Sequence, residues 1–184
     1  AVGFEALKAN TDDGDNTAVG CRAMLATTTG HSNTALGALA LDTNTTGCFN
    51  TAIGSIALGD STTASQNTAV GYQSLVATTT GCQNAVVGFK AMDANTTGDR
   101  NVAMGRDALG SNTSADYNVA IGSEAMEANT TGTLNTAVGH KALQSNTTAN
   151  SNTAIGTCSL RVNTTGAQNT AVGKGSLIAT TEGA

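Results

Sequence analysis

Few residues of this chain carry side chains that commonly do catalytic chemistry, and they form no recognisable arrangement. The two histidines are His31 and His140, and neither has a Ser, Asp or Cys at a recurring spacing that would suggest a nucleophile with its base. The sequence also contains neither a phosphate-binding loop nor zinc-ligand spacing. We therefore expect no enzyme activity, no cofactor and no metal site in this segment.

The acidic and thiol side chains give similarly weak signals. Asp12, Asp13 and Asp15 form an acidic cluster, but their spacing is not that of an EF-hand calcium loop, and a solvated Asp-Gly turn is the simpler interpretation. Cys48 and Cys82 share a repeat position two repeats apart, which at strand spacing is about 9–10 Å. This distance exceeds the roughly 7 Å Cα separation that a disulfide tolerates. We expect free thiols.

One phrase organises the chain: Asn-Thr-Ala-Val-Gly begins at Asn16 and recurs every 17 residues in ten full copies, the last from Asn169. We number the repeat from this Asn as position 1. Position 4 is aliphatic, position 8 is small and position 9 is Leu or Met, so we expect all three to be buried. Positions 6 and 7 are charged in several copies and are expected to face water.

Positions 12 to 15 usually read Asn-Thr-Thr-Gly, which is typical of a turn. Gly at position 15 would supply a positive φ, and the Asn or Thr side chains would bond to nearby backbone. Ala64, Ala115 and Ala149 replace this Gly in three copies. A positive φ therefore cannot be obligatory there.

A short fixed period indicates a solenoid. Positions 1 to 4 favour a short strand that ends at Gly. A helix about 10 Å wide does not stack at a strand spacing of about 4.8 Å, so we expect a tight turn or second strand afterwards. The sequence predicts an all-β β-solenoid or β-roll of about eleven coils in one repeat array over residues 1–184. Both ends fall within a repeat, so we expect a fragment of a longer fibre.

The Asn at position 1 recurs without exception in the full copies. It could read a ligand, or it could form an internal ladder in which each amide bonds the next coil. We favour the ladder, because identical copies suit stacking. Its members are Asn16, Asn33, Asn50, Asn67, Asn84, Asn101, Asn118, Asn135, Asn152 and Asn169.

A second group of Asn residues, at position 12, spells glycosylation sequons. Each is followed two residues later by Thr or Ser, which would allow surface glycans in a glycosylating environment. The other interpretation is turn chemistry, because Thr27, Ser61 and Thr78 occupy the same position in other copies. The possible glycosylation sites are Asn44, Asn95, Asn112, Asn129, Asn146 and Asn163.

Composition excludes several functions and suggests association. The net charge is −5 and only 11% of residues are charged, without a basic stripe for nucleic acid. No apolar run approaches the roughly 20 residues of a membrane helix. Each coil buries too little apolar surface to stand alone, and a closed symmetric oligomer would bury more. We expect a parallel homotrimer with the small and aliphatic positions at its axis.

The phrase Asn-x-Ala-aliphatic-Gly resembles the head repeats of trimeric autotransporter adhesins. With its Ala-Leu and Asn-Thr-Thr-Gly continuation, the repeat also resembles arrays in phage tail fibre shafts. The resemblance implies a homotrimeric β-roll or β-solenoid that is structural or adhesive, located outside the cell or on a virion surface. It transfers no catalytic residue.

These observations together favour the structural shaft of an extended trimeric fibre that positions a distal tip. An adhesin or a glycosylated extracellular filament is the alternative, and an ice-binding protein with regular Thr rows is a further one. The expected partner is the chain itself. A cell-surface glycan or receptor would bind through parts outside this segment.

Overall fold

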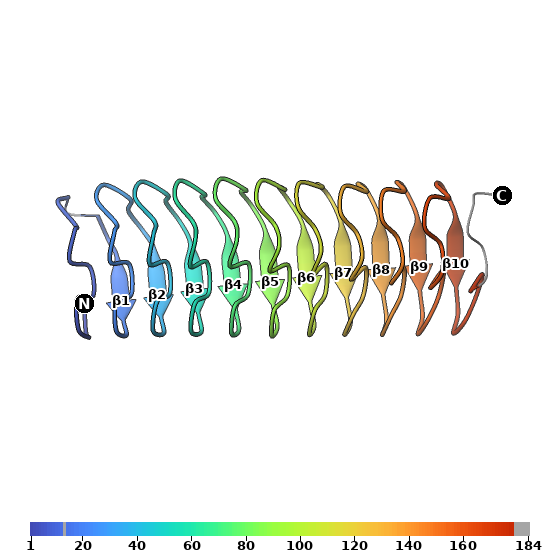
Figure 1. Cartoon of the computed structure of the whole chain (residues 1–184), viewed down its shortest axis with the longest axis horizontal. Helices are drawn as coiled ribbons and strands as arrows, with labels where there is room; N and C mark the ends of the chain where they lie inside the picture. The colour runs from blue at the N-terminus through green and yellow to red at the C-terminus, as the bar shows by residue number, and fades with distance from the viewer. Residues whose placement is uncertain (13, 179–184) are drawn as a thin grey trace.

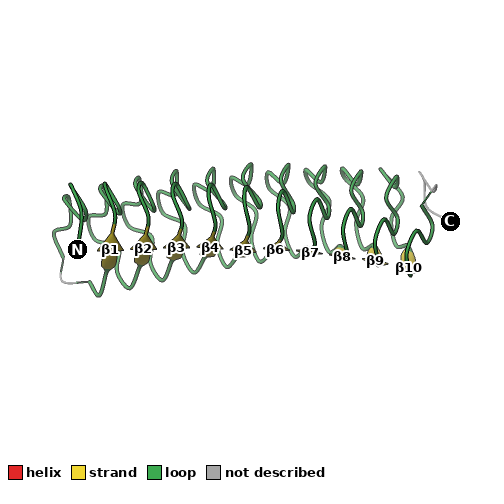
Figure 2. Cartoon of the chain, turned by 90° about the horizontal axis from the view of Figure 1, so that it is seen from below, coloured by secondary structure: helices red, strands yellow, loops and turns green. Residues whose placement is uncertain are grey.

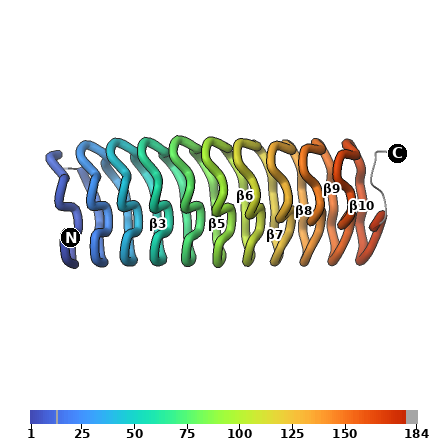
Figure 3. The backbone as a smooth tube through the Cα atoms, in the orientation of Figure 1, coloured from blue at the N-terminus to red at the C-terminus, as the bar shows by residue number. Residues whose placement is uncertain are grey.

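The computed structural model describes residues 1–12 and 14–178 as a rod of stacked coils. Figure 1 shows successive coils side by side along one axis, each with the same elongated outline. The backbone trace in Figure 3 follows this outline from coil to coil. Across the described ranges the chain contains strands, turns and bends but no helix. The all-β solenoid predicted from the repeat is confirmed.

Ten three-residue strands form one parallel sheet in chain order. The register joins each strand residue to the one 17 residues later, as in Thr17 with Thr34. An isolated bridge between Val2 and Val19 adds a partial coil before the first strand. The strands are β1 Thr17–Val19, β2 Thr34–Leu36, β3 Thr51–Ile53, β4 Thr68–Val70, β5 Ala85–Val87, β6 Val102–Met104, β7 Val119–Ile121, β8 Thr136–Val138, β9 Thr153–Ile155 and β10 Thr170–Val172.

Each strand ends at the Gly of position 5, where the next coil lies close to the backbone. Gly88, for example, has φ +145°, and a Cβ placed there would lie 2.4 Å from the carbonyl oxygen of Gly105 in the next coil. Only Gly adopts this backbone readily and leaves room for the adjacent chain. The prediction that the strand ends at this Gly is confirmed.

The segment after this Gly is a tight turn in which left-handed residues alternate with others. Arg22 and Met24, at positions 7 and 9, have φ of 57° and 52°. The Arg22 N–H donates to Phe4 O in the preceding coil (2.8 Å), whereas the Met24 N–H donates to Ala40 O in the following coil (2.9 Å). Left-handed backbone costs about 1–2 kcal/mol for such residues. Bonding to both neighbouring coils offsets this cost and excludes a helix.

The core lies inside the coil and is narrow. Ala35, Ala40 and Leu41, at positions 3, 8 and 9, are fully buried, which confirms the prediction for positions 8 and 9. The prediction that position 4 is buried is wrong, because Leu36 is 48% exposed and Ile53 is 37% exposed. Side chains alternate along a strand, so the inward Ala of position 3 places the larger aliphatic neighbour outside.

The second turn also differs from its prediction. Among the described residues, the Gly residues at position 15 do not have positive φ. The left-handed residue is at position 17, as in Phe49 (φ 60°) and Gln66 (φ 61°). Ala64 therefore needs no positive φ at position 15. The four cysteines are free, as expected.

Candidate interaction surface

The most unusual surface of the rod is the outward face of its sheet, formed by positions 2 and 4 of every strand. Figure 2 shows the strands in one row along the rod. Position 2 is Thr in seven strands and position 4 is aliphatic in all ten, so the face contains no charged residue. The position 4 side chains are exposed or half-buried: Val19, Leu36, Ile53, Val70, Val87, Met104, Ile121, Val138, Ile155 and Val172.

Backbone hydrogen bonds hold this face in a fixed geometry. The N–H at position 2 donates to the position 1 carbonyl of the next coil, as from Thr34 to Asn50 (2.8 Å). The N–H at position 5 donates to the position 4 carbonyl of the preceding coil, as from Gly54 to Leu36 (2.8 Å). The outward side chains are therefore presented as two straight rows at strand spacing.

The middle of the face differs from its ends. In β5, β6 and β7, position 2 is Ala85, Val102 and Val119 in place of Thr. Thr occupies position 2 in β1 to β4 and in β8 to β10. The face is thus wholly apolar over three successive strands and mixed with hydroxyl groups on either side. We call β5–β7 the apolar block.

The Asn residues at position 1 lie inside the coil and hydrogen-bond from one coil to the next. The Asn67 backbone N–H and Nδ2 both donate to Asn50 Oδ1, at 3.0 and 3.3 Å. Asn67 Nδ2 also donates to Gly81 O near the end of its own repeat (2.9 Å). These side chains tie successive coils together and close each coil, and those from Asn33 to Asn169 are buried.

The sequon Asn residues at position 12 are fully buried too. Asn112 Nδ2 donates to Asn95 Oδ1 in the preceding coil (2.8 Å) and to Ala115 O (3.2 Å). A glycan on this nitrogen would replace these bonds and has no space in the folded coil. The structure therefore places Asn44, Asn95, Asn112, Asn129, Asn146 and Asn163 in a second internal row, which favours turn chemistry over glycosylation.

This second row is interrupted at Ser61. Its hydroxyl is too short to continue the row, and both Ser61 Oγ and Asn44 Oδ1 are buried without a hydrogen-bond partner. Where Asn follows Asn, as from Asn95 to Asn112, the equivalent oxygen accepts from the next coil's amide. Ser61 therefore leaves one bond of this row missing between the coil of β2 and the coil of β3.

The two Thr rows of the turn have different surroundings. At position 13 the hydroxyl is used within the rod, as Thr45 Oγ1 donates to Thr62 O (3.0 Å) and Thr62 Oγ1 to Thr79 O (3.0 Å). At position 14 the side chains are exposed in every coil from Thr29 to Thr165. The row that is exposed in all of these coils is therefore the one at position 14.

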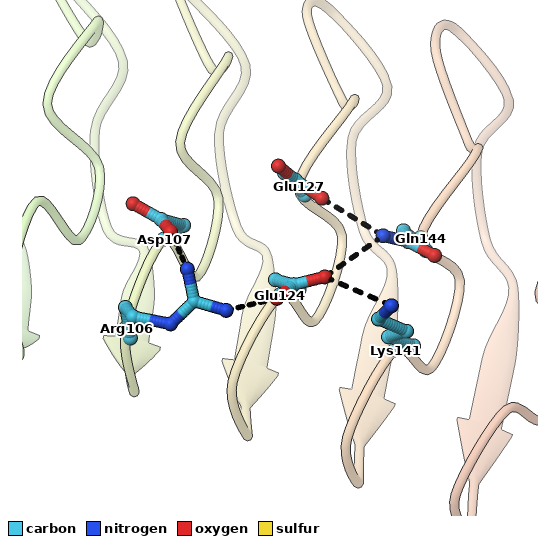
Figure 4. A network of polar contacts seen from close by, with 6 residues as sticks. All are labelled: Arg106, Asp107, Glu124, Glu127, Lys141 and Gln144. Atoms are coloured by element: carbon cyan, nitrogen blue, oxygen red, sulfur yellow. Dashed lines mark hydrogen bonds and ion pairs between the residues drawn. The ribbon is translucent and has the colours of Figure 1, made fainter.

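Charged side chains gather beside the sheet in the second half of the rod, at positions 6, 7 and 10. Glu124 is at the centre, where it pairs with Arg106 and lies 3.3 Å from Lys141 Nζ. Burial opposes ionisation of Glu124, but the hydrogen bonds and charges of Lys141 and Arg106 outweigh it and lower the pKa of this carboxyl. The network drawn in Figure 4 comprises Arg106, Asp107, Glu124, Glu127, Lys141 and Gln144.

Two other carboxyl groups, at position 10 on the same side of the rod, are half-buried. Burial raises the pKa of Asp93, against the opposing charge of Lys90. Burial also raises the pKa of Asp42, although Arg22 Nη2 lies 3.2 Å from its carboxylate and lowers it in part. These are positions where stacking forces a carboxylate away from water.

Exposed aromatic side chains form local pairs. Tyr72 and Phe89 stack across adjacent coils with ring centroids 5.6 Å apart, and His31 meets the edge of Phe49 at 5.1 Å. Tyr117 accepts a hydrogen bond from Arg100 Nη1 (2.5 Å). Such pairs are the surface that an adhesin would offer, but each extends over only two coils.

Catalytic chemistry gains no support from the described residues. His31 Nδ1 lies 3.3 Å from Ser32 Oγ, and His140 is exposed at another repeat position. Within residues 1–12 and 14–178, no group of His, Cys, Asp or Glu could hold a metal ion, and no ligand-sized pocket is present. Of the acidic cluster, Asp13 lies outside these residues. None of the described chain forms a helix long and apolar enough to cross a membrane.

The fold and its outward face define the class of this protein: a parallel β-solenoid of 17-residue repeats with one uncharged, aliphatic face. No family model matches the chain, and no curated protein or solved structure is significantly similar to it. Its resemblance to fibre repeats therefore rests on the repeated phrase itself.

Proposed function

We propose that this segment is the structural shaft of an extended fibre in which copies of the chain associate in parallel through the outward sheet face. The observation that supports the proposal most strongly is the unbroken aliphatic row at position 4, which is exposed or half-buried in all ten strands. Leu36, Val87 and Ile155 are 48%, 41% and 42% exposed in the single chain. A contiguous apolar surface of this kind usually marks an interaction site.

The composition of the face favours a second copy of the same chain as its partner. No charge on the ten strands would repel an identical face. Every copy also presents its rows at the same strand spacing, so identical faces match along their whole length. A partner with a different fold would match this strand spacing over only part of the face.

The shape of the face favours three copies over two. Ten strands of three residues make a strip of about 45 Å by about 10 Å, roughly 450 Å². This is less than the about 800 Å² per partner of a typical stable interface. Three strips turned toward one axis would bury the face of every copy and add contacts between their flanks. Closed symmetry of this kind is common in homo-oligomers.

The test is the molar mass of the purified chain by light scattering, with Ile53→Lys/Ile121→Lys as the disrupting variant. Thr63→Lys/Thr131→Lys places the same charges in the same coils at exposed position 14 and is the matched control. We expect three chain masses for the native protein and the control, and one for the disrupting variant. A monomeric native chain would refute the proposal, as would equal loss of association in both variants.

Ice binding is a second candidate, favoured by the exposed hydroxyl row of position 14 and by the Thr side chains of position 2. Regular hydroxyl groups at strand spacing could order water along the rod. The shaft proposal predicts no thermal hysteresis from the native protein. Measurable hysteresis that disappears when Thr46, Thr63 and Thr80 are changed to Lys would favour ice binding instead.

A further inference from the structure

We infer that the apolar block, β5–β7, sets the register in which copies of this chain associate along their sheet faces. The inference rests on the proposed shaft function, because it concerns how the copies align once they associate. The block can set the register because it differs from the rest of the face, where Thr and aliphatic side chains alternate in the same way in every strand.

A perfectly repetitive face cannot specify its own alignment. Sliding one rod past another by one coil, about 4.8 Å, would bring equivalent side chains opposite each other again. Only the contacts at the two ends would be lost. Register is weakly specified wherever successive strands present the same pattern. An associating solenoid therefore needs a non-repeating feature on the interface itself.

The apolar block is such a feature. Ala85, Val102 and Val119 remove the position 2 hydroxyl from three successive strands, while Thr68 and Thr136 retain it on both sides. When the blocks of two copies coincide, apolar side chains face apolar side chains. A slip by one coil moves a Thr hydroxyl of each copy against the other's block, where it is buried without a partner. An unpaired buried hydroxyl is strongly disfavoured.

The position of the block also distinguishes parallel from antiparallel association. Four strands precede it and three follow it. In a parallel arrangement, coinciding blocks bring all ten strands into register. In an antiparallel arrangement, coinciding blocks leave β1 of each copy unmatched, beyond the β10 end of the other. Block alignment and complete burial of the face therefore agree only for parallel copies.

Photo-cross-linking tests the register directly, with p-benzoylphenylalanine in place of Leu36 in β2. Mixing ¹⁵N-labelled and unlabelled chains separates links between copies from links within a copy, and mass spectrometry locates the partner segment. The residues that follow the Gly after each strand differ in mass, Cys21-Arg22 after β1, Ala38-Leu39 after β2 and Ser55-Ile56 after β3, so peptides from the three segments are distinguishable. We expect links to β2 of the partner to exceed those to β1 and β3 by about tenfold or more, because each slip buries unpaired hydroxyls.

Two variants test whether the apolar block sets the register. The first, Ala85→Thr/Val102→Thr/Val119→Thr, makes position 2 hydroxyl-bearing throughout. The second replaces the seven Thr residues with Val and makes the face apolar throughout: Thr17, Thr34, Thr51, Thr68, Thr136, Thr153 and Thr170. Both remove the distinct block, but the second strengthens apolar contact. We expect cross-links to spread to β1 and β3 in the variants that still associate.

The outcomes separate the two proposals. A native chain that is monomeric by light scattering refutes the shaft and the inference together. A native oligomer whose links fall equally on β1, β2 and β3 refutes the inference and leaves the shaft standing. Retention of the β2 link in the uniformly apolar variant likewise refutes the inference, because that variant contains no distinct block to align.

Discussion

Gly88→Ala should destabilise this rod through a backbone collision, and the last coil supplies the matched control. The added Cβ of residue 88 would lie 2.4 Å from Gly105 O and 2.7 Å from Gly105 C. Gly173 occupies the same position in β10's coil and also has a positive φ, +118°, but a Cβ there meets nothing within 4 Å. The pair therefore separates collision between coils from backbone strain.

The structure gives a magnitude for each variant. Residues held in a Gly-only backbone region cost of order 1–3 kcal/mol, which applies to both positions. Forcing an extra carbon into a filled space adds typically about 1–3 kcal/mol, which applies only at Gly88. We expect a loss of about 2–6 kcal/mol for Gly88→Ala and about 1–3 kcal/mol for Gly173→Ala, since these terms add.

Hydrogen exchange measures the loss locally, which matters because end coils of a repeat array open more easily than central ones. The informative amides are Gly105 N–H, which donates to Val87 O (2.8 Å), and Gly173 N–H, which donates to Ile155 O (2.7 Å). Each variant is compared with the native chain at its own amide. Losses that agree within about 0.5 kcal/mol, the usual limit of additivity, would refute the collision as the reason for Gly at this position.

Three further predictions concern single side chains. Ser61→Asn should raise the free energy of unfolding in denaturant by about 1–3 kcal/mol, because the new amide can donate to the unpaired Asn44 Oδ1; no gain would contradict this account of the interrupted row. Glu124 has a lowered pKa, so its contribution is present above the ordinary value of 4.5 and is lost as the pH falls through the folded-state pKa. Glu124→Gln should therefore lower the Tm at neutral pH and leave it unchanged in strong acid. Asp93 has a raised pKa, so folded-state stability falls as the pH rises above 3.8 through that pKa. Asp93→Asn should raise the Tm at neutral pH, and the same rise in strong acid would contradict burial as its cause.

The solenoid was predictable because its period appears in every part of the chain. A repeat of 17 residues with one β-favouring segment leaves few ways to stack. The turn that follows the strand was not predictable, because sequence rules do not describe a backbone in which left-handed residues alternate with others. Good helix formers at Glu124 to Met126 adopt left-handed φ at two of three residues, because hydrogen bonds to the neighbouring coils outweigh local preference.

The direction in which the strand faces could not be read from apolar character, since positions 3 and 4 are both apolar. The informative signal was variability. Position 3 is Ala in every strand except β5, where Val86 takes its place, whereas position 4 varies among Val, Leu, Ile and Met. A narrow interior accepts one size of side chain, and an outward row tolerates several. The prediction that position 4 is buried relied on the larger side chains at that position. The near-constant Ala at position 3 would have identified position 3 as the inward one.

The hydrogen bonds between coils also determine how the rod would respond to force. They run between stacked coils, and therefore along the axis in which a tethered rod is pulled. Tension would act on one junction at a time and peel a coil from the end. Each coil of 17 residues would release about 55–60 Å of extended chain in exchange for about 5 Å of rod. Each coil that unfolds would thus add more than ten times the length of rod that it removes, and every coil would add the same length.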